Sequence, residues 1–198
     1  MKRLIFLLLI FITSASPALS RSQPVLYIGS GIGIPIAPGV FESSCAPGPI
    51  FTIGAGLRFN QAIELASMIE YHAFHVRPKA NIGSGTIKVT EIGLEGKLFL
   101  AESRHRLAPY LMAGVTLAEG VSSSAKTYYY GQETGHNFMA GSIGAIYTIG
   151  MGMDLTFGSH VGVYADVRAR FTSLNNDINN EIFSFAPIRA GLKIHLGK

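Results

Sequence analysis

VGVYADVRARFTSL (Val161–Leu174) is the stretch that decides the fold of this chain. Successive residues of a β-strand point to opposite faces, so residues two apart share a face. Along this stretch Asp166, Arg168 and Arg170 fall on one face, while small and apolar residues occupy the other. This alternation predicts a strand that separates a polar compartment from an apolar one.

Seven further stretches of the chain alternate in the same way. Glycine punctuates most of them, and apolar residues at helical spacing are absent. In the closing stretch FAPIRAGLKIHLG, Arg189 and Lys193 oppose Leu192 and Ile194. The eight predicted strands cover residues 24–35, 49–59, 62–74, 86–100, 108–118, 138–153, 161–172 and 185–196.

The connections between these strands alternate between long and short. An up-and-down meander explains this, because every second turn then falls on the same side of the sheet. Short turns on one side, long loops on the other and an even strand number are typical of outer-membrane barrels. The sequence predicts an all-β fold: an eight-stranded antiparallel up-and-down transmembrane β-barrel. Its long connections are 36–48, 119–136 and 173–184, with a shorter break near 75–85, and its tight ones are 60–61, 101–107 and 154–160.

The small residues decide which face of the predicted barrel is inside. A water-soluble barrel such as a lipocalin also alternates, with its polar face outward. Here Gly54, Gly93 and Gly191 share the parity of the charges, and glycine suits the crowded interior of a narrow eight-stranded barrel. The other parity is almost continuously apolar. We therefore expect the charges inside and the apolar side chains in contact with outer-membrane lipid.

The first twenty residues predict export from the cytoplasm. A basic start precedes an apolar run from Leu4 to Ile12, and small and polar residues follow. This order is typical of a cleaved secretory signal, and the run is about half of the ~20 residues that a membrane-spanning helix needs. We predict a signal peptide over 1–20, cleaved before Arg21 or, as second choice, after Ala18. Residues 21–198 are predicted to form one barrel domain.

Composition excludes several classes of function. Beyond residue 20, fourteen basic and twelve acidic residues leave a charge of +2, which requires no nucleic-acid partner. A single cysteine, Cys45, excludes an intrachain disulfide. The six histidines lack convincing ligand spacing, and His72 and His75 are predicted on opposite strand faces. We expect neither a metal nor another cofactor.

The chain resembles the small eight-stranded outer-membrane β-barrels, the OmpA/OmpX-like domains. The resemblance rests on the strand pattern, the stretch MGMDLTFGSHVGVYADVRARFTSL (151–174) and the closing FAPIRAGLKIHLG. The resemblance covers about 24–198 and is specific for a fold, not for an activity. It implies a place in the outer membrane of a Gram-negative-type envelope and insertion by the barrel-assembly machinery. Such chains often end on an aromatic residue, whereas this one ends Leu196-Gly197-Lys198.

Charged residues on the predicted inner face form the first candidate site. An eight-stranded barrel leaves little open lumen, and unpaired charges there would cost several kcal/mol each. We expect an ion-pair network that fills and rigidifies the barrel; the alternative is a gate on a narrow ion path. The partner of Arg168 depends on barrel shear, and Glu64, Glu70, Glu91 and Glu95 stay open. The predicted members are Arg58, Glu64, Glu70, Glu91, Glu95, Lys97, Asp166, Arg168, Arg170, Arg189 and Lys193.

A run of three tyrosines, Tyr128, Tyr129 and Tyr130, forms the second candidate site, in the long connection 119–136. Exposed there, the run would suit contact with a ligand; alternatively it extends a strand and packs on itself. The predicted function is a structural or surface-interaction role, in adhesion or envelope integrity, with an unknown extracellular ligand. A narrow pore for ions or small solutes is the first alternative.

A membrane-embedded lipid-modifying enzyme is the second alternative. Such an enzyme needs a serine nucleophile coupled to a histidine. Ser159 and His160 are adjacent in sequence, and neighbours in a strand point apart. Since no local motif couples the two, we predict no enzymatic activity and no catalytic residue.

Overall fold

The structure of the protein is a computed structural model that describes residues 22–36, 40–79, 81–100, 107–138, 142–175 and 180–196. The predicted signal peptide over 1–20 and its cleavage site lie outside the described residues. The last two residues of the chain lie outside them too. Within the described ranges, no helix is long and apolar enough to cross a membrane.

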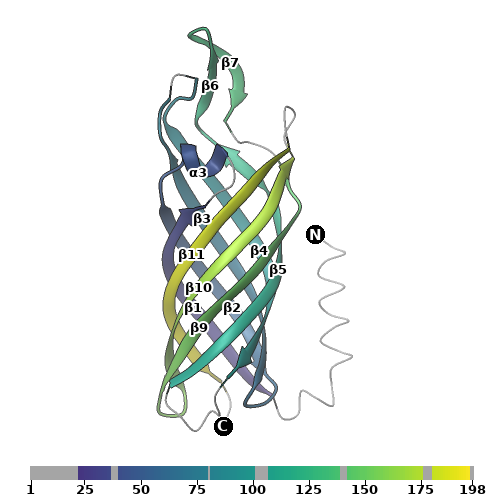
Figure 1. Cartoon of the computed structure of the whole chain (residues 1–198). Helices are drawn as coiled ribbons and strands as arrows, with labels where there is room; N and C mark the ends of the chain where they lie inside the picture. Colours follow the sequence, from purple (N-terminus) through teal and green to yellow (C-terminus); the bar gives the residue numbers. More distant parts are fainter. Residues whose placement is uncertain are drawn as a thin grey trace.

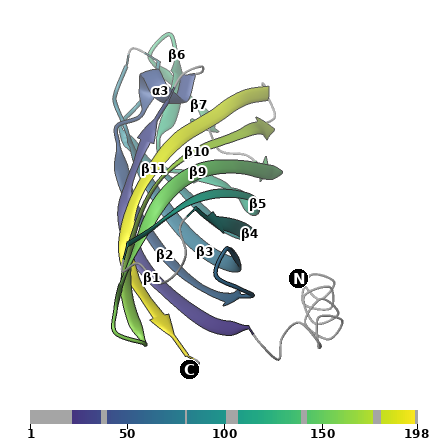
Figure 2. The same cartoon turned by 60° about the horizontal axis from the view of Figure 1, so that its bottom comes forward.

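Eight long antiparallel strands close into a barrel, as predicted (Figures 1 and 2). The last strand pairs with the first, from Val25 opposite His195 to Pro35 opposite Phe185. Closure satisfies the backbone groups that an open sheet edge would leave unpaired in hydrocarbon. The strands are β1 (Gln23–Pro35), β2 (Gly48–Arg58), β3 (Ile63–Val76), β4 (Gly85–Phe99), β5 (Leu107–Ser123), β9 (Ala145–Phe157), β10 (Val161–Asn175) and β11 (Asn180–His195).

Several strands are longer than their alternating pattern predicted. β5 continues to Ser123, beyond the expected end at 118, and β9 continues to Phe157, beyond 153. The sixth strand also begins later, at Ala145, after the two-residue strand β8 (Ser142–Ile143), which pairs with the end of β10. Backbone pairing can continue where side chains no longer alternate, so these extensions leave little signal in the sequence.

The long connections contain structure that the sequence did not predict. A short helix, α3 (Val40–Ser44), lies in the connection predicted as a loop over 36–48. The connection over 119–136 contains a hairpin of β6 (Lys126–Tyr129) and β7 (Gln132–Asn137), which stands beyond the barrel rim in Figure 1. Tyr130 and Gly131 at its turn both have positive φ, 49° and 79°, as a two-residue type I′ turn requires.

The two faces of each barrel strand differ sharply. In β4, Glu91, Glu95 and Lys97 are buried in the lumen, while Ile92 and Leu94 alternate with them on the outside, 38% and 43% exposed. The same outward apolar face recurs in the other barrel strands. An apolar face that recurs around a closed barrel of this kind is typical of a surface that contacts lipid.

Three layers of side chains fill the lumen between the short turns and the long connections. An aromatic and lysine layer lies nearest the short turns, a layer of carboxylates and guanidinium groups follows, and an apolar layer packs around Phe41 of α3. Glycine makes room for the aromatic layer, since a Cβ at Gly29 would collide with the Tyr164 hydroxyl. The lumen is therefore a packed core, with charge in its middle.

Candidate functional site

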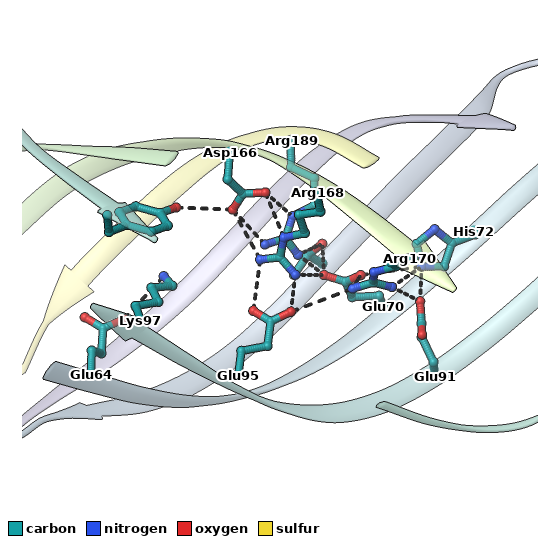
Figure 3. Close-up of polar contacts among 12 residues, drawn as sticks. Glu64, Glu70, His72, Glu91, Glu95, Lys97, Asp166, Arg168, Arg170 and Arg189 are labelled. Carbon is teal, nitrogen blue, oxygen red and sulfur yellow. Dashed lines mark hydrogen bonds and ion pairs between the residues drawn. The ribbon is translucent and has the colours of Figure 1, made fainter. Parts of the chain in front are cut away.

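Arg168 lies at the centre of the charged layer (Figure 3). Its guanidinium donates to Asp166, with Nε–Oδ1 at 2.9 Å, and also binds Glu95, with Nη2–Oε2 at 2.9 Å. Glu70 is a further neighbour, with Nη1–Oε1 at 3.6 Å. Asp166 is two residues away on β10, whereas Glu95 comes from β4 across the lumen. The structure therefore leaves Glu95 and Asp166 as the main partners of Arg168.

Two further arginines complete what we call the mid-lumen cluster. Arg189 on β11 binds Asp166, with Nη2–Oδ2 at 2.9 Å, and also contacts Glu70. Arg170 contacts Glu91 and Glu70. The cluster consists of Glu70, His72, Glu91, Glu95, Asp166, Arg168, Arg170 and Arg189.

A second group, the lysine cluster, lies nearer the short turns. Glu64 binds Lys193, with Oε2–Nζ at 2.7 Å, and Lys97, with Oε1–Nζ at 3.3 Å. Lys193 also contacts Asp154, and the Tyr27 hydroxyl donates to Glu64. Three tyrosine rings surround the Lys97 ammonium, with centroids 4.0, 5.0 and 5.6 Å from Nζ, and the ring quadrupoles favour the cation. The rings belong to Tyr27, Tyr110 and Tyr164.

The structure brings ten of the eleven predicted lumen residues into these two clusters. The eleventh, Arg58, is buried near the short turns, and no carboxylate of the described residues lies within 4.0 Å of it. His72 and Asp154 also belong to these clusters and were not among the predicted members. Asp154 shares the parity of Gly150 and Gly152, which marks the inner face of the strand. It was missed because the strand was predicted to end at residue 153.

His72 lies between the mid-lumen cluster and the apolar layer. Its Nε2 contacts Glu91 and lies 3.5 Å from Glu70 Oε2, and its ring packs 5.0 Å from that of Phe185. One donor atom from each of Glu70, His72 and Glu91 could in principle hold a metal ion, since these atoms lie within 4.8 Å of one another. Arg170 already binds both carboxylates, so its cation occupies the place of a metal.

A buried apolar layer separates the charged layers from the outer end of the barrel. Phe41 of α3 packs against Phe74 in edge-to-face contact, with ring centroids 4.9 Å apart, and Phe74 packs against Phe185. All three rings are fully buried. We call this layer the apolar plug; it consists of Phe41, Cys45, Phe74, Val76, Ile87, Val89, Ala125, Phe138, Ile146 and Phe185.

The predicted loop tyrosines lie on the outer hairpin. Tyr129 and Tyr130 are 70% and 91% exposed, and their rings make an edge contact at 4.5 Å. Tyr128 pairs with Glu133 across the hairpin and is less exposed. Both residues lie at the turn of the hairpin, and the hairpin stands beyond the barrel rim in Figure 1.

Ser159 and His160 are in contact, although neighbours in a strand would point apart. They lie in the turn between β9 and β10, inside the tight connection predicted over 154–160, and Ser159 Oγ is 2.6 Å from His160 Nδ1. Both side chains are exposed, and no carboxylate of the described residues contacts the imidazole. The pair lacks the third group that orients a catalytic histidine.

Comparison with known proteins places the fold. No protein-family model matches the chain. No curated protein is significantly similar to it in sequence. Among solved structures it is similar to Neisserial surface protein A, with 17% identity, coverage of 87% of this chain and 96% of that one, and a TM-score of 0.53. It is also similar to the outer membrane protein OprG of Pseudomonas aeruginosa, with 11% identity, coverage of 89% and 97%, and a TM-score of 0.56.

The chain has the fold of the small eight-stranded outer-membrane β-barrels, as predicted. Its fold and its apolar outer band place it in the outer membrane of a Gram-negative-type envelope. Barrels of this class direct their short turns to the periplasm and their long connections outward. The hairpin of β6 and β7 therefore faces the exterior, and the end with the short turns faces the periplasm.

Proposed function

We propose that this protein acts at the cell surface as a closed barrel that anchors a binding hairpin. The observation that carries the proposal is the pair of exposed rings, Tyr129 and Tyr130, at the tip of a hairpin that stands clear of the membrane. Large exposed aromatic rings contribute strongly to binding because they bury much area and lose few rotamers. Their partner is an extracellular ligand.

The packed lumen supports a binding role over the alternative of a narrow pore. Arg168, Arg170 and Arg189 cross-link strands on opposite sides of the lumen. The apolar plug closes the outer end above them. An ion on this route would have to displace both layers, and an apolar constriction also resists wetting. Export by a signal at residues 1–20 and insertion by the barrel-assembly machinery belong to the same proposal.

The test compares ligand binding with conductance in one set of proteins. The mature chain in lipid nanodiscs is applied to a glycan array and to immobilised extracellular-matrix proteins. The variant carries Tyr129→Ser and Tyr130→Ser. We expect the natural protein to bind a subset of these surfaces, and we expect binding to fall at least about tenfold in the double variant, since two anchor residues are removed.

The matched control is Tyr147→Ser, which removes an exposed tyrosine from the lipid-facing surface and leaves the hairpin unchanged. Its binding should equal that of the natural protein. Planar-bilayer recordings of all three proteins should show no steady current. A stable single-channel current from the natural protein, with binding unaffected by the tyrosine changes, would replace the binding role with the pore.

A further inference from the structure

A cavity of about 350 Å³ opens at the periplasmic end of the barrel, the end that is turned forward in Figure 2. Its wall is formed by residues of five strands, β1, β2, β5, β9 and β11, and of two short turns. The lining contains hydroxyl and amide groups, one arginine and one histidine, but no Asp or Glu. Its members include Arg58, Asn60, Gln61, Thr156, Ser159 and His195.

Arg58 is the charge in this wall, and no carboxylate of the described residues lies within 4.0 Å of its guanidinium. The buried interior of the described residues holds six carboxylates and six Lys or Arg side chains. The lysine cluster balances two against two, so Lys97 and Lys193 satisfy Glu64 and Asp154. The mid-lumen cluster has four carboxylates to three arginines and includes His72. Counted together, the six cations and six carboxylates balance, but Arg58 lies outside both clusters, at the cavity.

The donors of Arg58 are only partly used. Its Nε donates to the Asn60 carbonyl oxygen at 3.3 Å and its Nη2 to the Gln61 carbonyl oxygen at 2.9 Å. One face of the guanidinium is covered by the Phe99 ring, 4.0 Å from Cζ to the centroid. A guanidinium has five N–H donors, so Arg58 keeps donors for an anion beyond those that bind acceptors of the described residues. Arg58 is only 8% exposed, so most of its side chain is covered by protein and its free donors face the cavity.

The neutral groups of the wall favour a particular kind of anion. His195 is 7% exposed, and its Nε2 has no hydrogen-bond partner among the described residues. Asn60 Oδ1 already accepts two backbone N–H bonds of its turn, so its amide group is left as a donor. Ser159 adds a hydroxyl. The single guanidinium of Arg58 matches a ligand group with one negative charge. The side-chain amides of Asn60 and Gln61 beside it can hydrogen-bond the peptide groups of the same ligand.

We propose that this cavity binds the free carboxylate end of a short peptide in the periplasm, with Arg58 as the carboxylate-binding residue. The peptide carboxylate accepts hydrogen bonds from the guanidinium, and the amide and hydroxyl groups of the turns contact the terminal peptide unit. Such carboxylates come from two sources, the C-termini of proteins and the stem peptides of the cell wall, which differ in the chirality of their terminal residues.

Isothermal titration of the mature chain in lipid nanodiscs tests the site directly. The probes are N-acetyl-L-alanyl-L-alanine, the D,D isomer, the C-terminal amide of each peptide, and inorganic phosphate. We expect an acid probe to bind at least about tenfold more tightly than its amide, because the amide lacks the charge that Arg58 pairs with. A preference for the L,L or the D,D acid identifies which of the two sources fits the cavity.

Arg58→Gln should weaken binding of the acid at least about tenfold, and Arg58→Lys should retain part of the binding. The control is Arg77→Gln, at an exposed position in an outer connection, and it should leave binding unchanged. Equal binding of acid and amide, or phosphate binding more tightly than either acid, overturns the proposal. If Arg58→Gln does not fold, the acid and amide probes on the natural protein still decide. The outcome is independent of the hairpin, which lies at the opposite end of the barrel.

Discussion

Replacing Arg168 with alanine should destabilise the barrel strongly, because the change leaves a carboxylate buried without its main partner. Asp166 would retain two contacts with Arg189, at 2.9 and 3.1 Å. Glu95 would retain only Arg170, at 3.7 Å. Glu95 is 1% exposed, so water cannot replace the lost guanidinium. Breaking a buried pair by removing one partner costs about 3–5 kcal/mol.

The assay is urea unfolding of the mature chain in phospholipid vesicles, followed by the mobility difference between boiled and unboiled samples on a denaturing gel. Tyr129→Ala serves as the control, since a surface change away from the network should shift stability by less than about 0.5 kcal/mol. Removing both charges together, as Arg168→Met with Glu95→Leu, should recover most of the loss, because the pair is then replaced by apolar groups. Equal unfolding midpoints for Arg168→Ala and Tyr129→Ala would refute the reasoning.

Three further changes test other parts of the barrel. Gly191→Val should block folding or lower the urea midpoint in the same gel assay, because a Cβ at Gly191 collides with the Ile28 carbonyl oxygen. The control Ala190→Val, on the lipid-facing side, should leave the midpoint nearly unchanged. Phe74→Ala removes a fully buried ring from the apolar plug and should lower the free energy of unfolding by about 3–5 kcal/mol in urea titrations. Cys45 lies in the outer connection, and burial raises the pKa of its thiol from about 9 to about 12. Maleimide at pH 8 should therefore label the unfolded chain only. Because the unfolded thiol loses its proton first, this contribution to stability should be complete below about pH 9 and lost as the pH rises towards 12, and Cys45→Ala should lack it.

The strand count and the face of each residue followed from the sequence because both are local properties. A period of two along each strand assigns Asp166, Arg168 and Arg170 to one face whatever the strand pairs with. Glycines at the same parity then distinguish the inside from the outside, since a narrow lumen has little room. The structure has these charges in the lumen and the apolar parity outside.

The outer end was predicted less well, for a physical reason. Beyond the membrane, strands no longer separate lipid from lumen, so alternation weakens while backbone pairing continues. β5 therefore extends past the predicted end, and the hairpin of β6 and β7 lies in what was predicted to be a loop. The short helix α3 is held by burial of Phe41 in the barrel mouth, a contact made with distant strands.

The sequence by itself determined that an exported chain with this alternation forms a closed barrel with its charges inside. Only the tertiary structure decided which charges meet. Glu95 contacts Arg168 from a strand 73 residues away, and that pairing depends on the stagger of the strands around the closed barrel. That Arg58 lies outside both ion-pair clusters is visible for the same reason only after closure, because it depends on which interior charges of the described residues pair with one another.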